Sequence, residues 1–274
     1  MNTQEIFYIA LKAAGLEEAP ADSGVIVPGE NIKKIAFGVD IEAAEIMLAR
    51  ELGFDCVITH HPQGSHRVDL YKVMDNQIDR MVKAGVPINK AQKVLAERKG
   101  QVDRGMHVTN YDRAAHAAKM LKMPFIAIHS PADFLVENYL QSYLDERMAD
   151  NPRALTKDVI ELLLEIPEYK NSYTKPKVRV GSEESFAGKV FVTMAGGTSG
   201  GKEVFKAYFE AGVGTLVVMH VPEDVIKAVK EQNIGNVLVA GHMASDSVGI
   251  NLIIKEFEAQ GLEVTRMAGV IEPC

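Results

Sequence analysis

The chain has 274 residues, of which 47% are hydrophobic and 24% are charged. This length suits one large α/β unit or two lobes, and this composition excludes a disordered or low-complexity chain. No apolar run approaches the ~18 residues of a membrane span, so we expect no membrane-spanning segment. A net charge of −7, without any run of Lys and Arg, argues against nucleic-acid binding.

The N-terminal residues 1–15 predict an amphipathic helix rather than a signal peptide, with Ile6, Ile9 and Ala13 on its apolar face. We therefore expect a cytoplasmic protein. The two cysteines, Cys56 and Cys274, are too few for a disulfide framework or a four-thiolate zinc site. Cys56 lies within an apolar run, which predicts a position in the core.

Short β-branched runs alternate with longer amphipathic stretches, which is typical of βα units and a largely parallel sheet. The sequence therefore predicts an α/β fold. The expected strands are residues 35–39, 54–59, 125–128, 189–194, 215–219, 236–240 and 263–267. The expected helices are residues 41–52, most of 68–121 with breaks near Gly85 and Gly105, 132–165, 202–211, 222–232 and 244–260. Residues 166–185 show little periodicity and predict a connection between lobes.

Most of the eight histidines directly follow a predicted strand. They are His60, His61, His129, His220 and His242. The carboxyl ends of parallel strands share one edge, so these imidazoles can converge on a ligand there. Imidazole is a common ligand of transition metals, although a single strand-end histidine more often bonds a backbone carbonyl. Pro62 favours an extended backbone at His61, at a strand end where both imidazoles can point into one crevice, and this favours a metal site.

Two carboxylates stand where they can join these histidines. Asp246 is four residues after His242, in the first turn of an expected helix, where the helix dipole favours a negative charge. Asp112 follows a His-Val-Thr-Asn-Tyr segment and can supply an oxygen that bridges two cations. Taken alone, Asp246 fits equally well as a residue that only stabilises the helix dipole. His116, one helical turn after Asp112, fits the solvent-exposed face of a helix better than a ligand site.

A glycine-rich turn spans Gly196 to Lys202, between a predicted strand and a predicted helix. It fits the first seven positions of a phosphate-binding loop, but Glu203 stands where that loop needs a hydroxyl for magnesium. The sequence thus excludes an ATPase or GTPase of that kind. Two interpretations stay open: the backbone amides hold an anionic group of a substrate, or the glycines allow a tight turn.

These motifs together resemble the Nif-three-like family of dinuclear metal proteins, related to NGG-one-interacting factor three. The resemblance rests on Ile35 to Asp40, Asp55 to Pro62, Asn110 to Asp112, Gly196 to Gly201 and Gly241-His242. By position it implies five metal ligands: His60, His61, Asp112, His242 and Asp246. This chain has Asp246 where the family usually has glutamate, and Val108 separates His107 from Thr109 in the family's His-Thr-Asn-x-Asp segment.

The resemblance also implies two intertwined α/β lobes with mostly parallel sheets, a ring-shaped homohexamer and two divalent transition-metal ions per chain. Zinc, iron, manganese and nickel all suit mixed imidazole and carboxylate ligands. We expect residues 1–125 and 235–274 to form the metal-bearing lobe and residues 126–234 the second lobe.

The leading functional hypothesis is a metal-dependent hydrolase that uses a water bridging the two ions, since such a water ionises near neutral pH. Family members are often described as type two GTP cyclohydrolases, so the expected substrate is a small molecule such as a nucleotide. His107, His129 or His220 would carry protons. The alternative is a metal-binding or regulatory interaction protein without enzymatic activity, for which the same ligands would serve.

Overall fold

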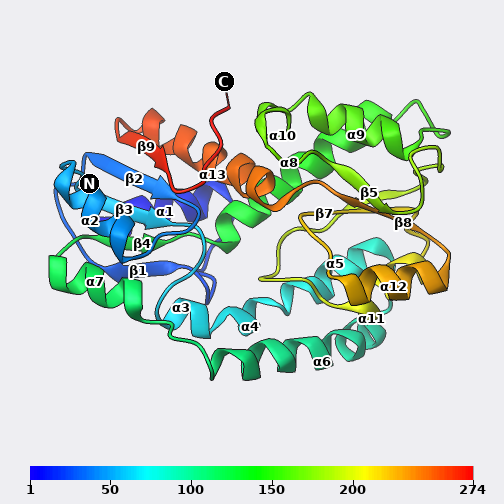
Figure 1. The fold of residues 1–274 in the computed structure, drawn as a ribbon, viewed down its shortest axis with the longest axis horizontal. Coiled ribbons are helices and arrows are strands. Elements are labelled where there is room, and N and C mark those ends of the chain that lie inside the picture. The colour runs from blue at the N-terminus through cyan, green and yellow to red at the C-terminus, as the bar shows by residue number, and fades with distance from the viewer. Residues whose placement is uncertain (274) are drawn as a thin grey trace. The chain divides into compact units, whose positions relative to one another are not determined.

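The computed structural model describes residues 1–273, which fall into two compact units; Cys274 lies outside the described residues. The first unit comprises Met1–Val73, Val102–Leu135 and Asp246–Glu272. The second unit comprises Met74–Gln101, Val136–Ser245 and residue 273. Each unit contains one mostly parallel sheet with helices, as Figure 1 shows, which confirms the predicted α/β class.

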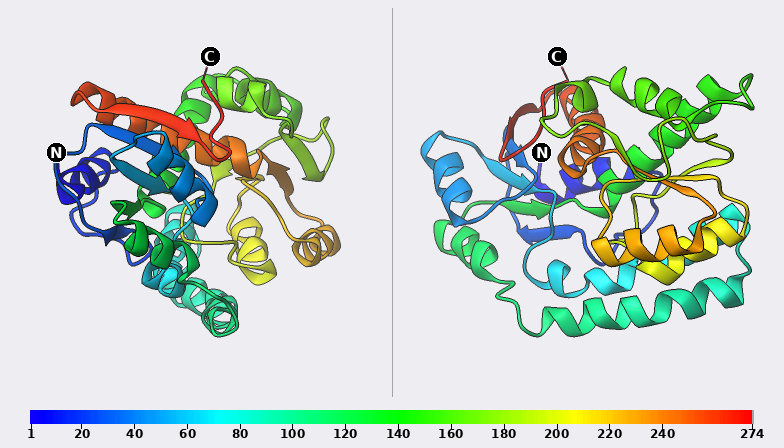
Figure 2. Two further views of the ribbon diagram at one scale, coloured as in Figure 1. Left: turned by 60° about the vertical axis from the view of Figure 1, so that its left-hand side comes forward. Right: turned by 45° about the vertical axis from the view of Figure 1, so that its right-hand side comes forward.

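The first unit has a five-stranded sheet in the order β1-β4-β3-β2-β9. Its strands are β1 (Gly24–Val27), β2 (Lys34–Gly38), β3 (Cys56–Thr59), β4 (Phe125–Ala127) and β9 (Glu263–Met267). Only β1 is antiparallel to its neighbour. The last strand of the chain, β9, thus lies beside β2, which comes early in the chain, as the red and blue arrows of Figure 2 show.

The helices of the first unit cover both faces of this sheet. They are α1 (Thr3–Ala13), α2 (Ala43–Glu51), α3 (Ser65–Val68), α4 (Leu70–Val73) and α7 (Arg113–Leu121). Asn2 starts α1 with a capping box to Glu5. One buried cluster joins α2 and α7 to the sheet residues Ala36 and Val57, and Phe37 meets Phe257 of α13 (His242–Ala259) on the opposite face.

The second unit has a four-stranded sheet in the order β5-β8-β7-β6. Its strands are β5 (Lys177–Val180), β6 (Val190–Val192), β7 (Thr215–Val218) and β8 (Asn236–Val239), of which β5 is antiparallel to β8. Its helices are α5 (Asn76–Ala84), α9 (Thr156–Leu164), α10 (Pro167–Asn171), α11 (Lys202–Glu210) and α12 (Glu223–Gln232). Three helices run from one unit into the other: α6 (Ile88–Met106), α8 (Ser130–Met148) and α13.

One prediction about the elements needs correction. Residues 166–185 do not connect lobes: they form α10 and β5 within the second unit, because β5 pairs with β8. Both breaks expected in the helical stretch 68–121 are present: α5 ends before Gly85, which has a positive φ of 115°, and α6 ends at Met106, next to Gly105. No helix within residues 1–273 combines the length and hydropathy needed to cross a membrane.

The boundaries of the two units differ from the predicted lobes in three segments and at residue 273. Residues 74–101 and 235–245 lie in the second unit, and residues 126–135 lie in the first. Residues 235–245 belong to the second unit because β8 lies between β5 and β7 in the second sheet. Residues 126–135 stay with the first sheet because β4 pairs with β3.

Candidate metal centre

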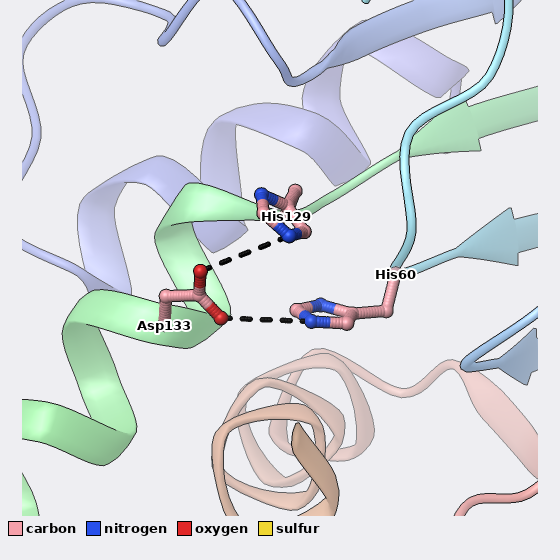
Figure 3. Close-up of side chains that lie close together, drawn as sticks. All are labelled: His60, His129 and Asp133. Carbon is pink, nitrogen blue, oxygen red and sulfur yellow. Dashed lines mark ion pairs between the residues drawn. The ribbon is translucent and has the colours of Figure 1, made fainter. Parts of the chain in front are cut away.

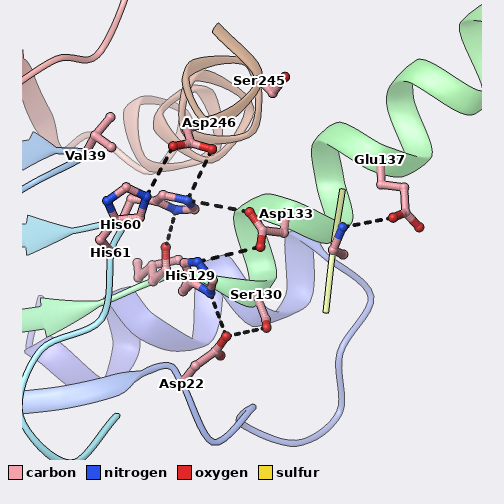
Figure 4. Close-up of polar contacts among 12 residues, drawn as sticks. Asp22, Val39, His60, His61, His129, Ser130, Asp133, Glu137, Ser245 and Asp246 are labelled. Carbon is pink, nitrogen blue, oxygen red and sulfur yellow. Dashed lines mark hydrogen bonds and ion pairs between the residues drawn. The ribbon is translucent and has the colours of Figure 1, made fainter. Parts of the chain in front are cut away.

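Five side chains of the first unit gather at the carboxyl edge of its parallel strands. His60 and His61 directly follow β3, and His129 lies just beyond β4. Asp133 stands near the start of α8, and Asp246 stands one turn into α13. We call these five residues the histidine–aspartate cluster (Figure 4). Ligands of open α/β sheets bind at this edge, so the cluster lies where a ligand site is expected.

Two of the three imidazoles are fixed from the neighbouring strand ends. The Nδ1 atom of His60 donates a hydrogen bond to the carbonyl oxygen of Ile128 at 3.1 Å. The Nδ1 atom of His61 lies 2.7 Å from Oδ1 of Asp40, which follows β2. A ring held through Nδ1 turns its Nε2 atom elsewhere, and such partners commonly orient the histidine ligands of metals.

The third imidazole, that of His129, is held by a buried carboxylate. Its Nδ1 atom lies 2.7 Å from Oδ2 of Asp22. Asp22 precedes β1, and because β1 is antiparallel its start lies at the same edge as the end of β4. The hydroxyls of Ser130 and Ser23 donate to the two oxygens of Asp22, at 2.7 and 3.1 Å. The carboxylate that orients His129 is therefore itself fixed.

The Nε2 side of each ring faces a carboxylate of the cluster. Asp133 lies between two rings in Figure 3, with Oδ1 3.5 Å from Nε2 of His60 and Oδ2 3.8 Å from Nε2 of His129. Asp246 lies between His60 and His61 in the same manner, with oxygen to nitrogen distances of 3.6 and 3.5 Å. His60 thus contacts both carboxylates.

The spacing of these atoms suits metal ligands. Hydrogen bonds of the N–H···O type span about 2.7–3.2 Å, whereas two ligands of a tetrahedral zinc ion lie about 3.3–3.4 Å apart. Two sets of three ligand atoms lie within 4.8 Å of one another: His60, His129 and Asp133, and His60, His61 and Asp246. Oδ1 of Asp133 is buried and accepts no hydrogen bond from the described residues. The residues present therefore fit a divalent cation.

The protonation of the cluster also suits displacement by a cation. Burial lowers the pKa of His60 to about 4 against the attraction of Asp246, so this ring is neutral at pH 7. Burial also opposes charge on His61 and His129, but adjacent carboxylates outweigh it and raise their pKa values to about 10 and about 8. Burial raises the pKa of Asp133 to about 7. A metal that binds these side chains would therefore release the protons that they hold.

Three of the five predicted ligands, His60, His61 and Asp246, lie together in the cluster. Asp246, in the place of the family's glutamate, reaches both histidines. His129, expected only as a proton carrier, and Asp133, which was not among the predicted ligands, lie beside them. The sequence does hold a signal for these two, because they have the same His-x-x-x-Asp spacing as the pair that ends in Asp246.

The other two predicted ligands lie in different surroundings. Asp112 precedes α7, and its Oδ2 atom is 3.0 Å from Nε2 of His116. His242 begins α13, and its ring centroid is 4.9 Å from that of His220 in the second unit. Among residues 1–273, neither Asp112 nor His242 belongs to a set of three or more converging ligand atoms.

The glycine-rich turn is filled by a side chain of its own unit. Gln77 donates from Nε2 to the carbonyl oxygens of Gly196 and Thr198, at 2.8 and 2.6 Å. A Cβ atom on Gly196 would lie 2.6 Å from Cγ of Gln77, so only glycine allows this close approach. Of the two interpretations left open by the sequence, this packing favours the tight turn.

The fold and the cluster define a class of two-unit α/β protein with a candidate metal site at a sheet edge. A family model described as Duf34/NIF3 (NGG1p interacting factor 3) matches residues 1–88. A NIF3 superfamily protein from Sphaerobacter thermophilus, known from its crystal structure, is 35% identical, with a TM-score of 0.94 over 98% of either chain. The chain belongs to the NIF3 superfamily, which confirms the resemblance drawn from its motifs.

Two more distant structures share the fold. Reduced HcgD from Methanocaldococcus jannaschii is 16% identical over 97% of each chain, with a TM-score of 0.62. A Bacillus cereus protein related to NIF3 is 11% identical over 99% of this chain and 97% of its own, with a TM-score of 0.54. No curated protein matches the chain.

Proposed function

We propose that this protein is a metal-dependent hydrolase of a small molecule and that the histidine–aspartate cluster holds its metal. One observation carries the proposal: three imidazoles, each fixed at Nδ1, turn Nε2 toward two buried carboxylates at the ligand-binding edge of the sheet. Imidazole nitrogen together with carboxylate oxygen suits zinc, iron, manganese or nickel. The resemblance adds the expectation of two such ions per chain.

A divalent cation on these ligands supplies a nucleophile near neutral pH, because it lowers the pKa of a coordinated water to about 7. The part of the chain is to present its ligands in a fixed orientation and to limit access. His61 is the only member of the cluster that is not fully buried. We therefore expect substrate to approach from the side of His61. Of the three histidines considered as proton carriers, His129 has its ring in the cluster.

The substrate and the assembly are also part of the proposal. The family resemblance makes a purine nucleotide such as GTP the first substrate to test, with amides and phosphoesters next. We expect the protein to act in the cytoplasm as the homohexamer that the resemblance implies. The mass of the assembly in solution, measured by light scattering, tests this expectation.

The experiment starts from metal-free protein reloaded separately with zinc, iron, manganese or nickel. GTP, amide and phosphoester substrates are then offered to each preparation. We expect turnover only in reloaded protein, and we expect His61→Ala to abolish it while the fold is retained. His116→Ala is the matched control, since it removes an exposed imidazole that pairs with Asp112 outside the cluster.

Turnover by metal-free protein, or undiminished turnover in His61→Ala, would contradict metal-dependent hydrolysis at this cluster. If the protein binds metal at the cluster but hydrolyses none of the three substrate classes, the alternative gains support: a metal-binding or regulatory protein without enzymatic activity.

A further inference from the structure

The two ligand sets of the cluster share one atom. Nε2 of His60 belongs both to the set with His129 and Asp133 and to the set with His61 and Asp246. The Nδ1 atom of the same ring is engaged with the carbonyl oxygen of Ile128, so Nε2 is the atom left for a metal. A neutral imidazole nitrogen has one lone pair. His60 therefore serves one ion at a time, and the two positions compete for it.

The surroundings of the two positions differ in burial. The side chains of His129 and Asp133 are 8% and 5% exposed, and Asp22, which orients His129, is fully buried. The side chain of His61 is 26% exposed, and that of Asp40, which orients His61, is 68% exposed. The position at His129 is thus enclosed, and the position at His61 opens to solvent.

The carboxylate that orients His129 is held in turn by a buried hydrogen-bond network. Asp22 is held by the hydroxyls of Ser130 and Ser23, and the hydroxyl of Ser23 also accepts a hydrogen bond from the backbone amide of His129. This network keeps the His129 ring in one place before any metal arrives. An oriented ligand loses less conformational freedom on binding than a mobile one, and a buried carboxylate partner strengthens a histidine ligand.

We propose that the two metal positions are unequal: His60, His129 and Asp133 hold one ion tightly, and His61 and Asp246 bind a second, exchangeable ion. The enclosed ion has a mainly structural role. The exchangeable ion is the one that solvent and substrate reach. This inference rests on the proposed function only in that both need metal at the cluster.

The test uses full-length protein titrated with Zn²⁺ alone, followed by dialysis against a weak chelator and elemental analysis. In the wild-type protein we expect two dissociation constants that differ at least about tenfold, the lower end of what orienting partners contribute to metal affinity. After dialysis, one equivalent should remain. His129→Ala should lose the retained equivalent, whereas His61→Ala should keep it and lose only the exchangeable one.

The two variants are matched, because each removes one imidazole from the same cluster. Asp133→Asn is a further variant for the enclosed position: it preserves the shape of the side chain and removes its charge, so it addresses the case in which His129→Ala does not fold. It should also lose the retained equivalent. Retention by Asp133→Asn, together with loss in His61→Ala, would overturn the assignment.

The outcomes separate this inference from the proposed function. Two ions of equal affinity in a protein that turns over substrate would overturn the inference alone. Two unequal ions in a protein that turns over none of the substrates would support the inference and count against the hydrolase. A wild-type protein that binds no Zn²⁺ would overturn both.

Discussion

The two sheets of this protein share a plan but not a site. Each has an antiparallel edge strand followed by parallel strands, in the orders β1-β4-β3-β2 and β5-β8-β7-β6. Histidines follow the corresponding strands of both sheets: His129 after β4 and His242 after β8, His60 after β3 and His220 after β7. Among residues 1–273, however, sets of three or more converging ligand atoms occur only in the first unit.

The correspondence extends to the helix that follows. Asp133 lies four residues after His129 near the start of α8, and Asp246 lies four residues after His242 near the start of α13. In the first unit His129 faces its own aspartate, with 3.8 Å between Nε2 and Oδ2. In the second unit His242 faces the ring of His220. The strand-end histidines of the two units thus have different neighbours.

The difference lies in what stands before the edge strand. Asp22 precedes β1 and holds the Nδ1 atom of His129, whereas the corresponding stretch before β5 contains Thr174 and Lys175 and no carboxylate. The position two residues before the edge strand is thus an aspartate in the first sheet and a lysine in the second.

The largest effect should separate the two edges directly. His60→Ala removes the atom shared by both ligand sets, so we expect it to abolish binding of the tightly held metal. His220→Ala removes the corresponding imidazole of the second sheet and should leave the metal content unchanged. Elemental analysis of the two variants beside the wild-type protein is the measurement. Equal loss of metal from both variants would show that the two sheet edges do not differ in metal binding.

The sequence predicted the parallel strands well and missed both antiparallel ones. The last strand was expected at residues 263–267 and is found there, and the strand expected at 35–39 is Lys34–Gly38. Of the four residues in β1 only Gly24 is fully buried, and in β5 only Val180. Such edge strands have little apolar pattern to detect, because their order depends on pairing with a strand distant in sequence.

The candidate site was predictable to a similar degree. The strand-end histidines were found because a strand and the residue after it are neighbours in sequence. Asp22 was not recognised as their partner, since 107 residues separate it from His129. The resemblance assigned Asp112 from a matching segment, but the segment alone does not give its position relative to the cluster. Long-range pairing therefore accounts for what the sequence could not provide.

The second prediction concerns pH and belongs to the first sheet edge alone. Neighbouring carboxylates raise the pKa of His129 to about 8, so this ring holds a proton below that pH and must release it to bind metal. Acid therefore weakens binding. Between pH 8 and pH 6 the affinity for Zn²⁺ should fall about 50-fold from this group alone. Titration calorimetry in buffers of different ionisation enthalpy measures both the affinity and the protons released.

The proton held by Asp133, whose pKa burial raises to about 7, adds to this fall. His116→Ala is the control, because it removes an exposed imidazole outside the cluster and should leave this fall in affinity unchanged. A wild-type affinity that stays constant from pH 8 to pH 6 would mean that no cluster proton competes with the metal.

The third prediction tests the orienting carboxylates. Asp22→Asn keeps the shape of the side chain but weakens its partnership with His129, so affinity for the tightly held ion should fall about 10–100-fold. Asp40→Asn makes the matched change at His61, where the carboxylate is exposed and screened by solvent, and should alter that affinity much less. Competition with a chromogenic chelator measures both variants. A larger loss of affinity in Asp40→Asn would place the tightly held ion at His61 instead.

The smallest effect is expected at Asp112, which the resemblance implies as a ligand and which the structure pairs with His116. Its side chain is 34% exposed and pairs with His116, an arrangement that contributes less than about 1 kcal/mol on the protein surface. Asp112→Ala should therefore retain the tightly held metal and unfold within a few degrees of the wild-type protein. Elemental analysis and thermal unfolding check both statements. Loss of one metal equivalent from Asp112→Ala, with full retention in His116→Ala, would restore Asp112 to the ligands.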